Sequence, residues 1–149
     1  VTSVWDALTE KENVIYAEGF SSETDVYDEK LAAEAIEAAK QVDKAVVFAG
    51  LPESFESEGY DRKHMHLPEC QNKLIAEIVK AQLNTIVVLH NGAAVEMPWL
   101  KDVKGLVEAY LGGQAVGQAE ANILYGNVNP SGKLAENPSY LNFGDGDKV

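Results

Sequence analysis

Residues 45–49 read Ala-Val-Val-Phe-Ala, and Gly50 closes this run. Further along the chain, residues 85–89 read Thr-Ile-Val-Val-Leu and residues 105–109 read Gly-Leu-Val-Glu-Ala. The first two runs are continuously apolar or β-branched rather than alternating, which is typical of parallel strands buried on both faces. The three runs therefore predict the centre of a parallel β-sheet.

Segments with helical spacing separate these predicted strands. Apolar side chains recur on one face of residues 30–42 and of residues 70–82, and residues 114–124 resume the same spacing. An alternation of strands and helices predicts right-handed crossovers that place helices on the sheet faces. We expect an α/β fold: a three-layer sandwich with a mostly parallel sheet and helices on both faces.

Four further segments complete the predicted order of elements. Residues 3–11 predict an opening helix, and residues 13–17 predict a short buried strand because they are mainly apolar. Residues 96–101 predict a short helix. From residue 127 onward Pro, Gly, Asn and Ser dominate, which predicts a loop-like tail.

The composition limits the classes of function. The 149 residues contain 12 Lys+Arg and 24 Asp+Glu, a formal net charge of −12, and 46% of them are hydrophobic. These values suit one globular domain, and the acidity argues against a nucleic-acid or anionic-membrane partner, since both need clustered Lys and Arg. No basic segment followed by an apolar one opens the chain, and a single cysteine, Cys70, excludes an internal disulfide. We therefore expect a cytoplasmic protein.

The connection after the first predicted strand, residues 50–69, is the best functional candidate. It has about twenty residues where a few suffice, and long loops in compact domains tend to be functional or disordered. Large apolar side chains such as Phe55 and Met65 are mixed with acids and histidines, which is unusual for a solvated linker. In open α/β sheets ligands also gather beyond the carboxyl ends of the strands.

One interpretation of this loop is catalytic carboxylate chemistry. Glu58 precedes Gly59, which lets the backbone turn and project the neighbouring carboxylate toward a ligand. A carboxylate placed in this way can act as a general acid or base. The alternative is that Glu56 and Glu58 are solvated loop acids and that Asp61 and Arg62 form a local ion pair, because surface acids are common.

Two other segments carry groups that could bind a ligand. His64, His66 and Cys70 carry atoms that bind zinc, but the pattern lacks a fixed fourth ligand, and we expect no metal. Residues 111–117, Leu-Gly-Gly-Gln-Ala-Val-Gly, place glycines before a helix, where N–H groups can bind phosphate. Their spacing matches neither the dinucleotide fingerprint nor the P-loop, and tight packing explains the glycines equally well, so no cofactor is expected. His90 could face the same crevice or simply be hydrogen-bonded.

Several blocks of sequence together point to one family. They are Ser-Glu-Gly-Tyr-Asp-Arg at residues 57–62, Val-Val-Leu-His-Asn-Gly at 87–92, Glu-Ala-Tyr-Leu-Gly-Gly-Gln at 108–114 and Asn-Pro-Ser-Gly-Lys-Leu at 129–134, with Trp99 between them. Their combination resembles the C-terminal α/β sandwich domain of the family 3 glycoside hydrolases, the β-glucosidases. The resemblance assigns residues 1–136 to that domain and leaves residues 137–149 as an irregular tail.

In that family the catalytic site lies between this domain and a (β/α)₈ barrel that carries an aspartate nucleophile. The resemblance implies that Glu58 is the acid/base glutamate and that Tyr60, Asp61 and Arg62 form the substrate-binding part of its loop. This is the retaining arrangement, in which one carboxylate attacks the sugar and the other protonates the departing oxygen. The implied partners are a β-glucoside and the barrel domain, and a homo-oligomer is possible.

Three departures from the family pattern matter. A first strand of Val-Ile-Gly-Pro type does not precede residue 1, a Thr-Phe-Pro block does not follow Glu136, and the chain has no barrel and so no nucleophile. We therefore expect a fragment of a retaining β-glucosidase that is inactive on its own. The alternative from another class is a non-catalytic α/β binding or interaction module.

Overall fold

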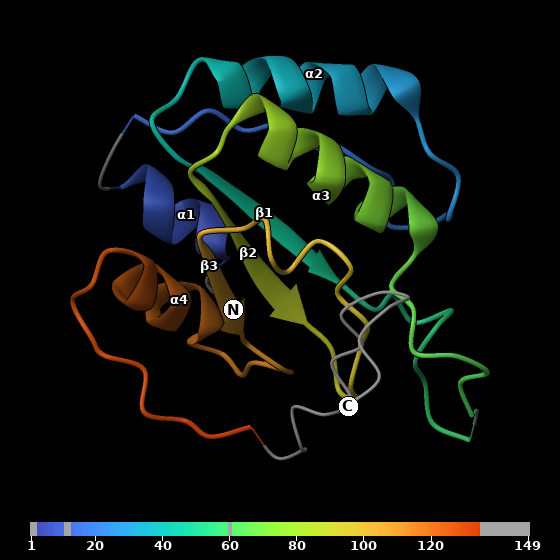
Figure 1. Ribbon diagram of the computed structural model, residues 1–149. Coiled ribbons are helices and arrows are strands. Elements are labelled where there is room, and N and C mark those ends of the chain that lie inside the picture. Colours follow the sequence, from blue (N-terminus) through green and yellow to red (C-terminus); the bar gives the residue numbers. More distant parts are fainter. Residues whose placement is uncertain (1–2, 11–12, 60, 135–149) are drawn as a thin grey trace.

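A computed structural model describes residues 3–10, 13–59 and 61–134 (Figure 1). The elements follow one another as α1 (Val4–Thr9), α2 (Glu29–Lys40), β1 (Ala45–Gly50), α3 (Glu69–Ala81), β2 (Thr85–His90), β3 (Gly105–Glu108) and α4 (Val116–Leu124). None of the helices in these ranges has the length and the apolar run needed to cross a membrane.

The sheet has three parallel strands in the order β1-β2-β3. Val47 of β1 lies opposite Val87 of β2, and Val88 opposite Val107 of β3. β2 is central, and Val87, Val88 and Leu89 are fully buried because helices cover both of its faces. The predictions drawn from the three apolar runs are confirmed.

The helices form a layer on each side of the sheet (Figure 1). α2 and α3 lie side by side on one face, and α1 packs against α4 on the other. The main core lies between α3 and the sheet; its buried residues are Ala49, Leu67, Ile75, Val79, Val87, Leu89, Val95, Met97 and Trp99. A second cluster joins α2 to α3 through Ala32, Ala35, Ala39, Leu74 and Ile78. This arrangement is the predicted three-layer α/β sandwich.

Side chains cap the first two helices where the sequence supplies them. Ser3 and Asp6 form a reciprocal capping box at the start of α1. Asp28 accepts hydrogen bonds from the N–H groups of Lys30 and Leu31, at 2.9 and 3.0 Å, and so begins α2.

Two predicted elements are wrong. Residues 13–17 form no strand, because no strand of the described residues pairs with them, and Ile15 and Tyr16 are 52% and 66% exposed. Residues 96–101 form turns rather than a helix: the Leu100 N–H donates to the Met97 oxygen at 3.0 Å, and no helical ladder follows. Residues 135–149, which include the predicted tail from residue 137, lie outside the described part of the chain.

Candidate functional site

The loops that follow the three strands leave the sheet at the same end, as parallel strands require. β1 ends at Gly50, whose N–H and C=O are both bound by the side-chain amide of Gln71 at 2.9 Å. A side chain is excluded at Gly50, since an added Cβ would lie 2.1 Å from the backbone oxygen of His90. The loop 51–67 therefore starts from a fixed point.

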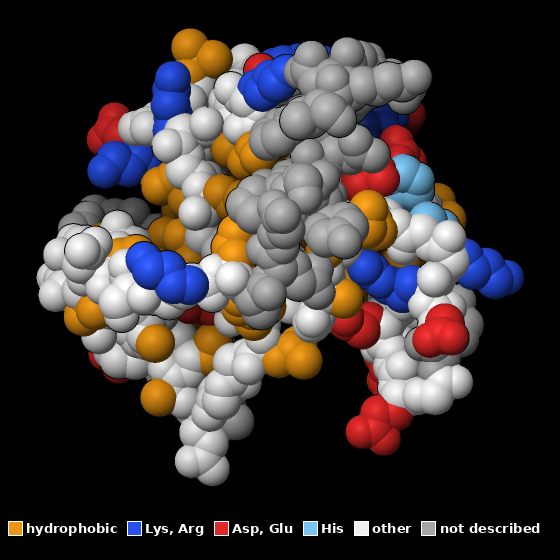
Figure 2. Space-filling view, turned by 60° about the horizontal axis from the view of Figure 1, so that its bottom comes forward, with side chains coloured by type: hydrophobic (Ala, Val, Ile, Leu, Met, Phe, Trp, Pro, Cys, Tyr) orange, Lys and Arg blue, Asp and Glu red, His pale blue; other side chains and the backbone are white. Residues whose placement is uncertain are grey.

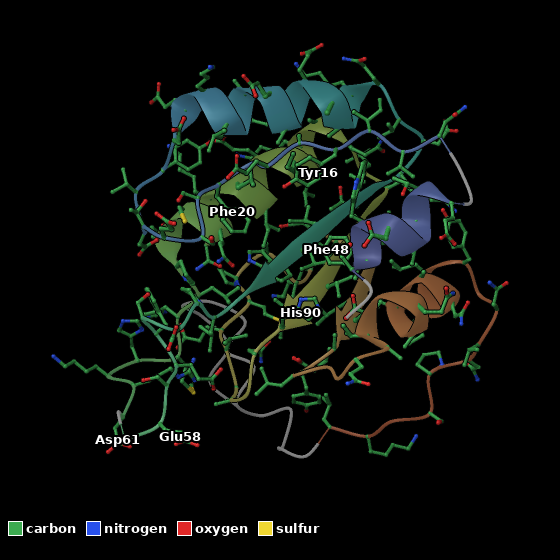
Figure 3. All side chains as sticks on the ribbon, turned by 180° about the vertical axis from the view of Figure 1, so that it is seen from behind. Tyr16, Phe20, Phe48, Glu58, Asp61 and His90 are labelled. Carbon is green, nitrogen blue, oxygen red and sulfur yellow. The ribbon has the colours of Figure 1, made fainter. Side chains whose placement is uncertain are left out.

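Glu58 and Asp61 are exposed at the tip of the loop 51–67, which projects away from the sheet (Figure 3). The turn at this tip depends on Gly59, whose φ of +74° is in the region that favours glycine. Figure 2 shows acidic, basic and histidine side chains gathered on the projecting part of the molecule that this loop forms. Tyr60, the third residue predicted for the tip, lies outside the described residues.

Both ends of the tip are attached to the turn that follows β2. The Glu56 Oε2 atom accepts a hydrogen bond of 2.7 Å from the Gly92 N–H. Arg62 donates from Nη2 to the backbone oxygen of Ala94 at 2.5 Å. Arg62 thus binds this turn, and the ion pairs of the described residues do not include the pair with Asp61 that the surface-acid alternative expected.

The turn at residues 92–94 is itself held by the buried side chain of Asn91, which precedes it. Asn91 is 2% exposed and donates from Nδ2 to the Ala93 oxygen at 2.9 Å, with the Glu108 Oε2 atom 3.5 Å away. Burial raises the pKa of Glu108 above its ordinary value, while hydrogen bonds from Tyr110 and Asn91 partly offset that rise. The loop with Glu58 is therefore tied to a segment anchored at the ends of β2 and β3.

His64, His66 and Cys70, which carry atoms that can bind zinc, do not converge on one point. The ring centroids of His64 and His66 lie 5.1 Å apart. The His66 Nδ1 atom lies 2.7 Å from the Glu96 Oε2 atom. Cys70 is buried, and its N–H binds Asp25 at 3.0 Å. In the described ranges no three His, Cys, Asp or Glu side chains are grouped so that they could hold a metal ion.

The glycines before α4 are explained at one position by packing. A Cβ at Gly112 would lie 2.2 Å from a methyl carbon of Val116, whereas Gly113 has open space around it. α4 begins without a side-chain cap at Ala115. The close contact at Gly112 favours the packing interpretation over a phosphate site.

His90 has a partner in the core rather than in the loop. Its Nε2 atom lies 2.6 Å from the carboxylate of Glu120 in α4, and its ring stacks on Phe48 at 6.2 Å between ring centroids (Figure 3). A shallow cleft of about 230 Å³ beside these rings is lined mainly by apolar residues, including Phe20 and Leu51. His90 is thus hydrogen-bonded, as the second alternative expects, and it also lines this cleft.

Sequence reasoning missed Glu56, Gly92 and Glu120. Glu56 is one of four acids in nine residues of the loop, so no pattern distinguishes it from its neighbours. Gly92 follows a predicted strand, where a glycine is ordinary for a turn. Glu120 lies in a predicted helix, and a carboxylate there is expected to be solvated.

Known proteins match this chain over nearly its whole length. The family model described as "Glycosyl hydrolase family 3 C-terminal domain" matches residues 1–138. Thermostable beta-glucosidase B of Acetivibrio thermocellus is 56% identical over 149 residues, which cover 94% of this chain and 20% of that protein. Exo-alpha-(1->6)-L-arabinopyranosidase of Bifidobacterium longum is 40% identical over 153 residues, which cover 96% of this chain and 20% of that protein.

Solved structures agree with the sequence matches. The family 3 β-glucosidase of Bifidobacterium adolescentis superposes with a TM-score of 0.87 at 42% identity, covering 91% of this chain and 20% of that one. The β-glucosidase of Kluyveromyces marxianus in complex with glucose gives a TM-score of 0.65 at 44% identity, covering 69% and 12%. The chain spans a fifth or less of the length of these proteins. The predicted resemblance is confirmed, and the chain belongs to the glycosyl hydrolase family 3 C-terminal domain family.

Proposed function

We propose that this chain supplies the general acid/base of a retaining β-glucosidase, and that Glu58 is the group that does so. The observation that carries the proposal is the position of Glu58: an exposed carboxylate at the tip of a projecting loop whose two ends are attached to the domain. An exposed tip can reach a sugar held by another domain, and attached ends limit how far it strays. Membership of the family supports the same assignment.

The proposed reaction has two steps. In the first, Glu58 donates its proton to the glycosidic oxygen while an aspartate attacks the anomeric carbon, so that the aglycone leaves as an alcohol and a glycosyl-enzyme forms. In the second, the Glu58 carboxylate removes a proton from water, whose oxygen attacks the anomeric carbon and releases the aspartate. Glu58 ends the cycle protonated, as it began.

The attacking aspartate is proposed to come from a (β/α)₈ barrel domain. Retaining enzymes hold their two carboxyl groups about 5–5.5 Å apart, so the barrel must pack against the side of the domain that carries the loop 51–67. The proteins that match this chain are about five times as long, which leaves ample length for a barrel. The isolated chain is then expected to lack activity.

The proposed substrate is a β-glucoside, since most of the similar proteins are named β-glucosidases. Tyr60 and Asp61 are proposed as contacts to the sugar from the acid/base side. The hydrogen bond from Arg62 to Ala94 supports a role for Arg62 in shaping the loop rather than in direct substrate contact.

The test replaces Glu58 by Gln in the full-length enzyme that carries this chain. Glutamine keeps the size of the side chain but cannot donate the proton, so kcat/KM for an alkyl β-glucoside should fall by about 10²–10⁴-fold. A dinitrophenyl β-glucoside, whose leaving group needs no proton, should lose far less. Glu53→Gln, at an exposed acid of the same loop, is the matched control and should change neither value. An equal loss of kcat/KM for both substrates would show that Glu58 does not donate the proton, and the alternative of a non-catalytic binding module would then stand.

A further inference from the structure

We propose that Glu56 and Arg62 are positioning residues that hold Glu58 in its working orientation by clamping both ends of the loop tip to residues 92–94. We call the hydrogen bonds Glu56–Gly92 and Arg62–Ala94 the two-point clamp. The inference rests on the proposed role of Glu58 and adds to it the residues that act through Glu58.

The clamp encloses the acid/base residue in the sequence. Glu56 lies two residues before Glu58, and Arg62 lies four residues after it. Each makes a charge-assisted hydrogen bond to a backbone group, and such bonds are shorter and stronger than neutral ones. Because both bonds reach the same short turn, the tip cannot swing about either end without breaking one of them.

The carboxylate of Glu56 occupies the space that a side chain at Gly92 would need. A Cβ at this position would lie 2.8 Å from Oε1 and 3.2 Å from Oε2 of Glu56, so any side chain would displace the carboxylate. The backbone itself does not demand glycine here, since Gly92 is not among the residues with positive φ. The Glu56 carboxylate is therefore the nearest group that a side chain at position 92 would meet.

Hydrogen bonds hold the turn at residues 92–94 and the strand end that precedes it. Asn91 is buried directly before it and holds the Ala93 oxygen at 2.9 Å. The Ala109 N–H binds the Leu89 oxygen at 2.9 Å and so joins the ends of β2 and β3 beneath the turn. Catalytic groups must be held close to their productive geometry, and a misplacement of about 1 Å can cost 10²-fold in rate. The two-point clamp therefore fixes the position of Glu58 relative to the end of the sheet.

A positioning role differs from a general structural role in which step it affects. If the clamp aims the proton of Glu58, losing it should slow the substrate that needs the proton and spare the one that does not. If the clamp only stabilises the domain, both substrates should lose rate equally, because the fraction of folded enzyme falls for both.

The experiment measures kcat/KM of the full-length enzyme for an alkyl and a dinitrophenyl β-glucoside. Glu56→Ala and Gly92→Ala should each lower the alkyl value by about 10- to 100-fold and change the dinitrophenyl value less than about threefold. Arg62→Met should behave in the same way. Glu56→Gln should recover most of the rate, because its amide oxygen can still accept from Gly92, and Lys63→Met and Glu53→Gln should have no effect.

The double variant Glu56→Ala/Gly92→Ala provides the sharpest test. The three atoms nearest to a Cβ at position 92 all belong to the Glu56 carboxylate, so once that carboxylate is gone the double variant should be no slower than Glu56→Ala alone. Multiplied losses in the double variant, or equal losses for both substrates in Glu56→Ala, would overturn the clamp. If Glu58→Gln itself shows no dependence on the leaving group, the proposed function fails and the clamp with it. If Glu58→Gln shows that dependence and Glu56→Ala does not, the clamp alone fails.

Discussion

The imidazole of His90, at the end of β2, lies 2.6 Å from the carboxylate of Glu120 in α4. Glu120 is 4% exposed, and its Oε2 atom is buried without a hydrogen-bond partner among the described residues. This pair is a polar contact between the sheet and the helix layer that contains α4. It leaves the buried carboxylate dependent on a single partner.

Replacing His90 by Ala should therefore destabilise the fold. The variant removes the single partner of the buried Glu120 carboxyl group, and leaving a buried polar group without a partner typically costs about 1–3 kcal/mol. Glu120→Gln should cost less, since the amide oxygen can still accept a hydrogen bond from the His90 ring. Urea unfolding of this chain measures both values, with His64→Ala at an exposed histidine as the control. A His90→Ala variant as stable as His64→Ala would show that the pair contributes nothing.

Stability should also depend on pH through Glu108. Burial raises the pKa of its carboxyl above the ordinary value of 4.5, so the folded state keeps this proton to higher pH than the unfolded state. The folded state binds more protons in that window, and the free energy of unfolding contributed by Glu108 falls as pH rises from about 4.5 through the folded pKa. Below 4.5 both states are protonated and the effect vanishes.

Glu108→Gln should remove this part of the pH dependence. Urea unfolding of the two chains between pH 4 and pH 8 should show a smaller decline for the variant, and Glu53→Gln should keep the slope of the natural sequence. Parallel profiles for Glu108→Gln and the natural sequence would contradict the assignment.

Cys70 should react slowly in the folded protein. Burial, together with a hydrogen bond that the thiol donates to the Asp25 carboxylate and the negative charge of that carboxylate, raises the pKa of the Cys70 thiol to about 11, so almost no thiolate exists at pH 8. Dithionitrobenzoate should modify it only as fast as the structure opens, and rapidly in urea. The variant Ser57→Cys/Cys70→Ala, which places the thiol on the exposed loop, should react at once. Rapid labelling of native Cys70 would mean that its surroundings are open.

The strands were predictable because a strand buried on both faces leaves a continuous apolar run, as at residues 85–89. Residues 13–17 carry a similar run but form no strand, since a strand requires a neighbour to pair with and a run of apolar residues does not supply one. At residues 96–101 the buried side chains Met97 and Trp99 lie two positions apart, which is not the spacing of a helix face, and the backbone makes only isolated turns.

The site was predictable in part. The Glu-Gly pair in the long loop predicted a turn beside an exposed acid, and Gly59 has a positive φ while Glu58 is exposed. The role of Glu58 stays a prediction. The partners of the loop were beyond reach, since Glu56 meets Gly92 across 36 residues of sequence and no periodicity encodes such a contact. Contacts between distant segments, rather than local sequence pattern, decide that Glu56 is hydrogen-bonded and that Glu58 is exposed.

Azide rescue of the Glu58→Gln enzyme tests the central claim most directly. With a dinitrophenyl β-glucoside the variant should form the glycosyl-enzyme but hydrolyse it slowly, because water lacks its base. Azide is a nucleophile that needs no base, so adding it should raise kcat and release β-glucosyl azide, while the natural enzyme and Glu53→Gln should be unaffected. A Glu58→Gln enzyme that azide does not accelerate, and that yields no glucosyl azide, would contradict the assignment of Glu58 as the acid/base.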